Sequence, residues 1–350
     1  MSTPDPVSLI DTARLASWMD GHALECGPIS ESESLCGGTQ NILVRFRRGS
    51  RYFVLRRGPA HLRPQSNQTI SREARVLSAL ASTRVPHPTL YAACNDESVL
   101  GAAFYLMEPV EGFNPRGTLP VPHSAEPAMR RRMGLALVEG IAELGALDYV
   151  SLGLADLGRT TGFLERQVSR WRSQLDSYAE YAGWQGPAEL GDVSGVGSWL
   201  ERCLPPAFTP GIMHGDYHLS NVMYRHDSAE LAAIVDWELT TIGDPLIDLG
   251  WLIATWPEPD GQQFPGVVGT APWDGFPTVA ELVEHYGRCS ARNLEHLRWY
   301  TVVACYKLAI ILEGTYARAC ARKSDLETGE RLHSAAQTLL RRARLWLSAD

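Results

Sequence analysis

The chain carries two linked motifs that limit its fold and chemistry: His214-Gly215-Asp216-Tyr217-His218-Leu219-Ser220-Asn221 and, further on, Ile234-Val235-Asp236-Trp237-Glu238. Asp216 and Asn221 are five residues apart, and Asp236 follows Asp216 by twenty. In phosphoryl transfer, one carboxylate orients the attacking hydroxyl, while an amide oxygen and a second carboxylate hold the magnesium ions. Each residue alone would suit a turn or a helix cap. Together they predict Asp216 as the catalytic residue and Asn221 and Asp236 as Mg²⁺ ligands.

His214 and His218 have the i,i+4 spacing of a zinc-binding pair, which is an alternative interpretation of the same segment. A metalloprotease motif needs a Glu after the first His, and it needs a helix. Here Gly215 follows the first His, and Pro210-Gly211 predicts a turn before a strand. We therefore expect both imidazoles to support the loop rather than to bind zinc.

Composition excludes several classes of function. The net charge of −8 argues against a nucleic-acid or anionic-membrane partner. The longest apolar runs, such as residues 249–256, are too short to cross a bilayer. The seven cysteines are scattered and include no Cys-x-x-Cys pair, so reduced thiols and a cytoplasmic location are expected. The polar N-terminus does not resemble a signal peptide.

Lysine is nearly absent from the chain, which contains only Lys307 and Lys323. A Walker A loop needs a lysine directly after its glycines, so that motif is excluded. Any side-chain cation that contacts nucleotide phosphates from the first half of the chain must therefore be an arginine.

Hydrophobic patterning predicts an α+β protein with two lobes. Residues 1–106 are expected to form a nucleotide-binding lobe, in which five antiparallel strands (29–36, 42–46, 52–55, 90–94 and 103–107) accompany helices at 7–20 and 69–81. Residues 107–112 are the expected hinge. Residues 113–350 are expected to be mainly helical, with a strand-loop-strand insert at 211–237 and helices at 125–147, 160–182, 195–204, 244–256, 278–292, 295–322 and 326–348.

Three segments of the first lobe are candidates for nucleotide binding. In the turn before residue 42, Gly37, Gly38, Gln40 and Asn41 could bring backbone N–H groups close to phosphate, although a Gly-Gly turn alone also fits a plain hairpin. Arg56 ends a strand and Glu73 lies in the next helix, which matches the cation–carboxylate pair that positions phosphates. The alternative is a surface salt bridge, and Arg57, Arg72 and Arg75 are close enough in sequence to be confused with the pair.

The expected hinge contains Met107, Glu108, Pro109 and Val110. Pro109 has no N–H, so Val110 is the predicted donor to adenine, the carbonyl of Glu108 the predicted acceptor, and Met107 the border of the pocket. The alternative is an ordinary turn between lobes. We expect Asp244 and Asp248, beyond the second motif, to have structural roles, with Asp248 directed at the backbone of the catalytic loop.

These motifs resemble the aminoglycoside phosphotransferase family, whose fold is that of eukaryotic protein kinases. The resemblance covers roughly residues 25–260 and rests on the glycine pair at 37, Arg56, Glu73, the segment from Leu106 to Gly112, and the two motifs quoted first. The amino-acid sequence at residues 55–59, 72–77 and 104–108 is most similar to one branch, the kinase-like domain of acyl-CoA dehydrogenase family fusion proteins in animals. Arg is usual at position 56 in that branch, where many other members have Lys.

The resemblance implies a protein-kinase-like two-lobe fold and an ATP- and Mg²⁺-dependent transfer of the γ-phosphoryl group to a hydroxyl of a small molecule, with ATP preferred to GTP. The acceptor would be a hydroxyacyl-CoA-like compound or another metabolite alcohol. Arginines on the 160–182 helix would then bind phosphates of the acceptor: Arg166, Arg170 and Arg172. The protein is expected to be a monomer or homodimer.

Three alternatives remain open. An aminoglycoside 3′-type phosphotransferase would need an acidic cleft, for which Glu238, Asp244 and Asp248 are candidates. A non-catalytic nucleotide-binding protein would keep the fold without turnover. A protein kinase is disfavoured, because the chain lacks Asp-Phe-Gly and Ala-Pro-Glu motifs.

Overall fold

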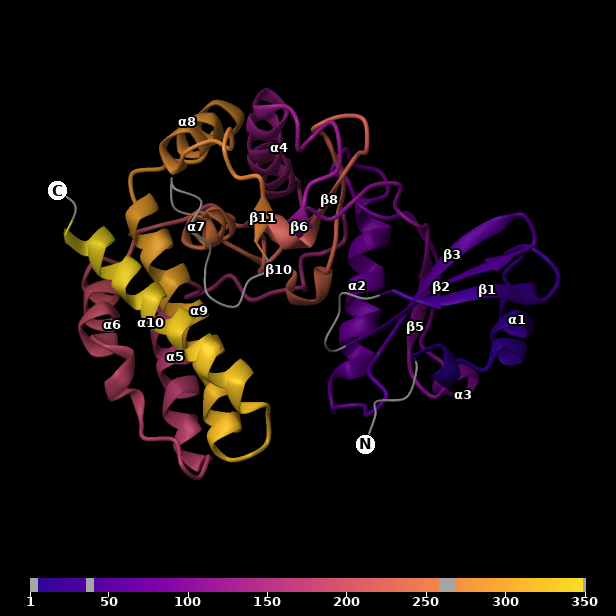
Figure 1. Cartoon of the computed structure of the whole chain (residues 1–350), viewed down its shortest axis with the longest axis horizontal. Coiled ribbons are helices and arrows are strands. Elements are labelled where there is room, and N and C mark those ends of the chain that lie inside the picture. Colours follow the sequence, from indigo (N-terminus) through magenta and orange to yellow (C-terminus); the bar gives the residue numbers. More distant parts are fainter. Residues whose placement is uncertain (1–5, 36–40, 258–268, 349–350) are drawn as a thin grey trace. The chain divides into compact units, whose positions relative to one another are not determined.

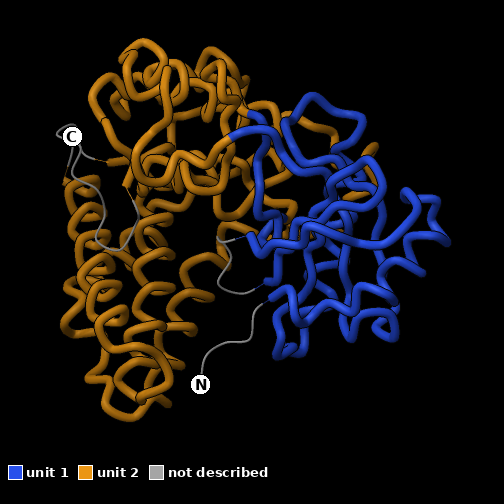
Figure 2. The backbone as a smooth tube through the Cα atoms, turned by 45° about the vertical axis from the view of Figure 1, so that its right-hand side comes forward, with its two compact units in different colours: residues 1–112, 232–240 blue, residues 113–231, 241–350 orange. Residues whose placement is uncertain are grey.

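The computed structural model describes residues 6–35, 41–257 and 269–348. Contacts divide the chain into two units, which Figure 2 colours separately. Unit 1 comprises Met1–Gly112 and Ala232–Thr240, and unit 2 comprises Phe113–Leu231 and Thr241–Asp350. The fold is α+β and protein-kinase-like. The expected division of nucleotide binding, hinge and substrate binding among 1–106, 107–112 and 113–350 stays a prediction.

Unit 1 is built on the predicted five-stranded antiparallel sheet, whose strand order is β1-β2-β3-β5-β4. Gly49, at φ +56°, and Ser50 close the β2–β3 hairpin so that Arg48 pairs with Arg51. The strands are β1 (Ile29–Ser34), β2 (Ile42–Arg48), β3 (Arg51–Arg57), β4 (Leu90–Cys94) and β5 (Phe104–Met107).

Helices cover both faces of this sheet, and neighbouring residues of one strand reach opposite faces. Side chains of α1 (Thr12–Asp20) and α3 (Glu97–Leu100) join Phe53 and Leu55 in one apolar core. Arg57, on that face, donates to the carbonyl of Leu100. Arg56 instead reaches α2 (Ser66–Leu80), which covers the other face (Figure 1).

Unit 2 is mainly helical, as predicted. Its central helix is α7 (Leu246–Thr255), which is buried from Leu246 to Ala254 and packs against α9 (Leu297–Cys320). The helix predicted at 160–182 is shorter, because α5 ends at Ser177 and the chain tightens into a 3₁₀ turn at Tyr178–Glu180. The other helices are α4 (Pro127–Ala146), α5 (Glu165–Ser177), α6 (Val193–Arg202), α8 (Val279–Cys289) and α10 (Leu326–Ser348).

Short strands in unit 2 position the first motif. β7 (Gly211–Met213) pairs antiparallel with β10 (Thr241–Gly243) and leads into the loop at His214, and Leu219–Asn221 forms a 3₁₀ turn. The other short strands of unit 2 are β6 (Gly117–Thr118), β8 (Val222–Tyr224) and β11 (Thr270–Ala271), and β9 (Leu231–Ile234) runs from unit 2 into unit 1. Of the helices in the described ranges, none is long and apolar enough to cross a membrane.

Candidate active site

The loop that carries Asp216 begins with a backbone turn that a buried carboxylate holds in place. Asp248, on α7 and 2% exposed, accepts hydrogen bonds from the N–H groups of His214 at 2.6 Å and Gly215 at 2.9 Å. Gly215 has φ +87°, a conformation that glycine adopts without strain. The predicted structural role of Asp248 is therefore observed, and the turn directs the chain into Asp216.

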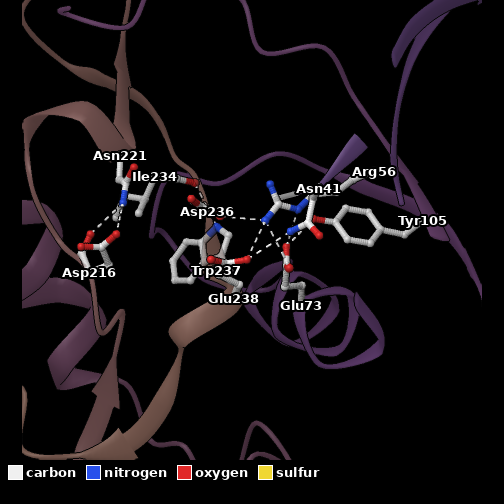
Figure 3. Close-up of polar contacts among 10 residues, drawn as sticks. All are labelled: Asn41, Arg56, Glu73, Tyr105, Asp216, Asn221, Ile234, Asp236, Trp237 and Glu238. Atoms are coloured by element: carbon white, nitrogen blue, oxygen red, sulfur yellow. Dashed lines mark hydrogen bonds and ion pairs between the residues drawn. The ribbon is translucent and has the colours of Figure 1, made fainter. Parts of the chain in front are cut away.

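Asn221 is tied to Asp216 by its amide nitrogen. Its Nδ2 donates to the carbonyl oxygen of Asp216 at 2.9 Å and to Oδ2 of the same residue at 3.0 Å (Figure 3). Asn114 braces the turn, because its Nδ2 donates to the carbonyls of Ser220 at 2.7 Å and Val222 at 3.0 Å. Because Nδ2 of Asn221 donates to Asp216, its amide oxygen Oδ1 is the side-chain atom that could bind a hard cation.

His218 contacts the carboxylate of Asp216, a role that the sequence did not indicate. Its Nδ1 accepts the N–H of Ser220 at 3.1 Å, so the proton of a neutral ring is on Nε2. That Nε2 lies 3.4 Å from Oδ1 of Asp216. Within the described ranges, neither His214 nor His218 belongs to a group of three side chains close enough to share a metal ion.

The surroundings of Asp216 keep its carboxylate ionised. Burial alone would raise the pKa of Asp216, but the hydrogen bond from His218 and electrostatic interactions with His218, His214 and Lys307 lower the pKa well below its ordinary value. Asp216 is consequently a proton acceptor at neutral pH, and its other oxygen, Oδ2, is fixed by Asn221.

Lys307 is a second residue that sequence patterns did not reveal as part of the site. It lies on α9, and its Nζ donates to the carbonyl oxygen of Gly215 at 3.1 Å. A lysine within an otherwise apolar helical segment was the available signal. Burial lowers the pKa of Lys307 to about 8, although the charges of Asp216 and Asp248 oppose that shift.

In unit 1, Arg56 is the centre of a cluster of charges in which Arg56 and Glu73 are buried and Asp236 is partly exposed (Figure 3). Its Nε lies 2.7 Å from Oε2 of Glu73, and its Nη2 donates to Oδ1 of Asp236 at 2.7 Å. The hydroxyl of Tyr105 donates to the same Oε2 of Glu73 at 3.0 Å. Arg56 and Glu73 are 6% and 1% exposed, so the salt bridge is a buried one and not a surface pair.

Electrostatics in this cluster follow from burial. Desolvation alone would lower the pKa of Arg56, but Glu73, Tyr105 and Asp236 raise it above its ordinary value. Burial raises the pKa of Glu73, and Arg56 opposes that rise. Two of the alternatives considered for the pair are engaged elsewhere: Arg57 donates to the carbonyl of Leu100, and Arg72 donates to the carbonyl of Thr240 at 3.2 Å.

Asp236 has a backbone conformation that is unusual for a residue other than glycine. Its φ and ψ are 67° and 61°, in the left-handed region, two residues after the end of β9 and just before the 3₁₀ turn Trp237–Leu239. Asp tolerates this region better than most residues, but such conformations cluster at functional sites. The turn presents the carboxylate to Arg56, and Glu238 lies 3.8 Å from the same guanidinium nitrogen.

The structure brings Asn41 to this cluster, where its Nδ2 donates to Oε2 of Glu238 at 3.1 Å. Glu238 was not among the predicted nucleotide-binding residues. The predicted phosphate-binding residues Gly37, Gly38 and Gln40 lie outside the described residues.

The predicted hinge follows β5, which ends at Met107. The N–H of Glu108 donates to the carbonyl of Thr89 at 2.9 Å, and its side chain accepts the N–H of Thr89 at 2.9 Å. In the described part of the chain the N–H of Val110 has no hydrogen-bond partner. Val110 thus keeps the free donor that adenine recognition requires, and that role stays a prediction.

The candidate residues therefore fall into two clusters. Asp216 and Asn221 belong to unit 2, whereas Arg56, Glu73 and Asp236 belong to unit 1. That all five act on one nucleotide stays a prediction.

Known proteins match this chain over most of its length. The family model described as "Phosphotransferase enzyme family" (APH) matches residues 35–282. Acyl-CoA dehydrogenase family member 11 from Pongo abelii is 31% identical over 323 residues, which are 89% of this chain and 40% of that protein. The chain thus spans well under half the length of this relative.

Solved structures show the same fold. A protein from Ralstonia eutropha JMP134, provisionally assigned as an aminoglycoside phosphotransferase, has a TM-score of 0.79 at 30% identity, with 96% of this chain and 98% of that chain covered. The complex of APH(2″)-IIIa with GDP and kanamycin has a TM-score of 0.63 at 16% identity, with 95% and 98% covered, and supports the fold alone. This chain belongs to the phosphotransferase enzyme family.

Proposed function

We propose that this protein transfers the γ-phosphoryl group of ATP to a hydroxyl group of a small molecule in a Mg²⁺-dependent reaction. The observation that carries the proposal is the arrangement at Asp216. Its carboxylate is ionised, is fixed by Asn221 and His218, and stands on a turn held by Asp248. Such a carboxylate can orient an attacking hydroxyl and accept its proton.

Asn221 and Asp236 are the proposed ligands of magnesium. They supply an amide oxygen and a carboxylate, which are the hard ligands that Mg²⁺ takes from proteins in small number. When bound, the ions neutralise negative charge on the phosphates. Asp236 now accepts from Arg56, so Arg56 must share or release this carboxylate when the cation binds.

Arg56 is the proposed phosphate contact, with Glu73 as the residue that orients it. A guanidinium can donate to two phosphate oxygens at once. Together with the hinge N–H of Val110 and the glycine pair, these residues would hold a purine nucleotide. ATP is the proposed donor. The GDP complex of APH(2″)-IIIa makes GTP the nucleotide to compare with it.

The buried acidic residues disfavour an aminoglycoside acceptor. Asp244 and Asp248 are 1% and 2% exposed and are engaged with Tyr300 and with backbone N–H groups, so neither lines an acidic cleft for a polycation. Of the three acidic residues expected to line such a cleft, only Glu238 remains a candidate. A hydroxyacyl-CoA-like compound or another metabolite alcohol is the proposed acceptor, in keeping with the acyl-CoA dehydrogenase relative.

The expected arginine cluster for acceptor phosphates is not supported as a group of three. Arg166 donates to the carbonyls of Thr161 and Arg159, and Arg172 pairs with Glu201 at 2.9 Å. Arg170 remains available and lies 5.2 Å from the ring centroid of Trp171. We further propose a cytoplasmic monomer or homodimer, consistent with the free cysteines among the described residues.

Two measurements test the proposal. The first is a screen of hydroxyl-bearing metabolites and aminoglycosides for Mg²⁺-dependent release of ADP. The second compares Asp216→Asn with Asp227→Asn, which changes an exposed carboxylate of the same unit. We expect Asp216→Asn to retain nucleotide binding and to lose about 10²- to 10⁴-fold in turnover, while the control keeps its rate. Unchanged turnover in Asp216→Asn would overturn the assignment.

The same screen, together with thermal stability measured with ATP, distinguishes an enzyme from a non-catalytic nucleotide-binding protein. Such a protein would be stabilised by ATP against heat without needing Mg²⁺, and no acceptor in the screen would release ADP. We expect stabilisation that depends on Mg²⁺.

A further inference from the structure

Lys307 is unusual in its surroundings. It is one of two lysines in the chain and lies on α9 among the buried residues Tyr306, Ala309 and Ile310. Lys307 itself is half-buried, and among the described residues its Nζ donates to a backbone carbonyl and not to a carboxylate. An ammonium group withdrawn from water without an ion pair is costly. The contacts of Lys307 must therefore offset the free-energy cost of removing its ammonium group from water.

The contacts of Lys307 lead to the catalytic loop. Its Nζ donates to the carbonyl of Gly215, the residue directly before Asp216. The same nitrogen lies 4.3 Å from the ring centroid of Trp251 on α7 and 5.6 Å from that of Trp171 on α5. Both aromatic rings face the ammonium group at distances that favour a cation–π interaction. Lys307 therefore links two helices to the loop through contacts that depend on its charge.

Two residues form hydrogen bonds with the backbone of Gly215. Asp248 accepts the N–H of Gly215, and Lys307 donates to its carbonyl. Gly215 has φ +87°, which lies outside the helical and strand conformations. The direction in which Asp216 leaves the turn thus depends on Lys307 as well as on Asp248.

We propose that Lys307 is a positioning residue of the phosphotransferase site, which holds the turn at Gly215 so that Asp216 faces the acceptor hydroxyl. The inference rests on the proposed function for its catalytic consequence, and on the contacts of Gly215 for its structural one. Lys307 acts through the loop and does not touch the nucleotide, so it governs turnover and not nucleotide affinity.

The proposal includes a dependence on pH. The charged groups that face Lys307 are Asp216 on the loop, Asp248 on α7 and Arg170 on α5. The two carboxylates favour the ammonium form, while burial and Arg170 disfavour it, and the pKa of Lys307 is lowered to about 8. Above that pH the amine loses its charge and its cation–π contacts, and its hydrogen bond to the carbonyl of Gly215 weakens because the donor is no longer charged.

The test compares Lys307→Met with Lys323→Met. The control removes the other lysine of the chain, which is exposed and also lies beside an aromatic ring, 5.2 Å from the centroid of Tyr181. We expect Lys307→Met to lower kcat about tenfold, as the loss of its two cation–π contacts and one charged hydrogen bond implies, with KM for the nucleotide unchanged. The control should match the wild type in both constants.

A second variant and a second readout separate positioning from general stability. Lys307→Arg keeps the charge at high pH, so it should retain more activity than Lys307→Met and should lose the decline above pH about 8. Hydrogen exchange at residues 213–221 should be faster in Lys307→Met than in the wild type, with protection elsewhere unchanged.

The outcomes are distinct for the two proposals. Unchanged kcat and unchanged loop protection in Lys307→Met would overturn the role of Lys307, as would a rise in nucleotide KM equal to the loss in kcat/KM. If the wild type transfers no phosphoryl group to any acceptor, the proposed function fails. Loop protection that depends on Lys307 would then still support the structural half of this inference.

Discussion

Replacing Arg56 by Met should expose how strongly the buried charges of unit 1 depend on one another. The change leaves Glu73, which is 1% exposed, with the hydroxyl of Tyr105 as its hydrogen-bond donor. Removing one partner of a buried ion pair typically destabilises a protein by about 3–5 kcal/mol, because the other charge stays buried without compensation. We therefore expect a loss of that size in the free energy of unfolding measured in urea.

A double-mutant cycle with Glu73→Gln separates this effect from a loss of packing. Gln is neutral and keeps an oxygen that can accept from Tyr105. In that background Arg56→Met should cost only about 1 kcal/mol, so the coupling energy between the two positions should exceed about 2 kcal/mol.

The stability lost in Arg56→Met should also depend on pH. Burial raises the pKa of Glu73, so this carboxyl takes up a proton more readily in the folded state than in the unfolded state. Losing Arg56 should raise the pKa of Glu73 further, whereas the unfolded pKa is common to both proteins and cancels. The stability deficit should therefore shrink as the pH falls to about 7, the raised pKa of Glu73 in the wild type, and stay constant below it.

Arg57→Met supplies the matched control for the cycle. Arg57 is the neighbouring residue and is 8% exposed, but it binds the carbonyl of Leu100 on the opposite face of the sheet. Its replacement should destabilise the protein without any coupling to Glu73→Gln. Equal costs of Arg56→Met in the wild-type and Glu73→Gln backgrounds would refute the reasoning.

Two further predictions concern the loop of unit 2. Asn221→Ala should raise the Mg²⁺ concentration needed for half-maximal activity and lower kcat, because the proposed metal ligand and the donor to Asp216 are lost together; a Mg²⁺ titration that matches Asp227→Asn would contradict this. Asp248→Asn replaces one of two acceptor oxygens with a donor that faces backbone N–H groups, so it should cost about 2–4 kcal/mol of unfolding free energy. A melting temperature equal to that of the wild type would show that the turn does not need this carboxylate.

Local sequence signals were sufficient for much of unit 1. The turn at Gly49-Ser50 fixed the register of β2 and β3, and the alternation of side chains along β3 separates Arg56 from Arg57. The alternation along β3 could therefore have distinguished Arg56 from Arg57 as the partner of Glu73. The chain's return to unit 1 at Ala232–Thr240 was not predicted, because no local pattern reports which unit a short strand and turn pack against.

Contacts between distant residues explain what sequence reasoning missed. Lys307 is 92 residues from Gly215, and its role depends on how α9 packs against α7 and the loop. The burial of Asp244 and Asp248 likewise depends on tertiary packing. Their spacing in the sequence was equally compatible with an acidic substrate cleft. The end of α5 was misplaced because its apolar spacing continues into a 3₁₀ turn.

A crystal structure of the protein with Mg²⁺ and a non-hydrolysable ATP analogue tests most directly whether the two clusters serve one nucleotide. We expect Oδ1 of Asn221 and a carboxylate oxygen of Asp236 to lie about 2.0–2.1 Å from magnesium, with Asp216 free of metal and open to an acceptor. A nucleotide bound with its phosphates and metal away from these side chains would contradict the account.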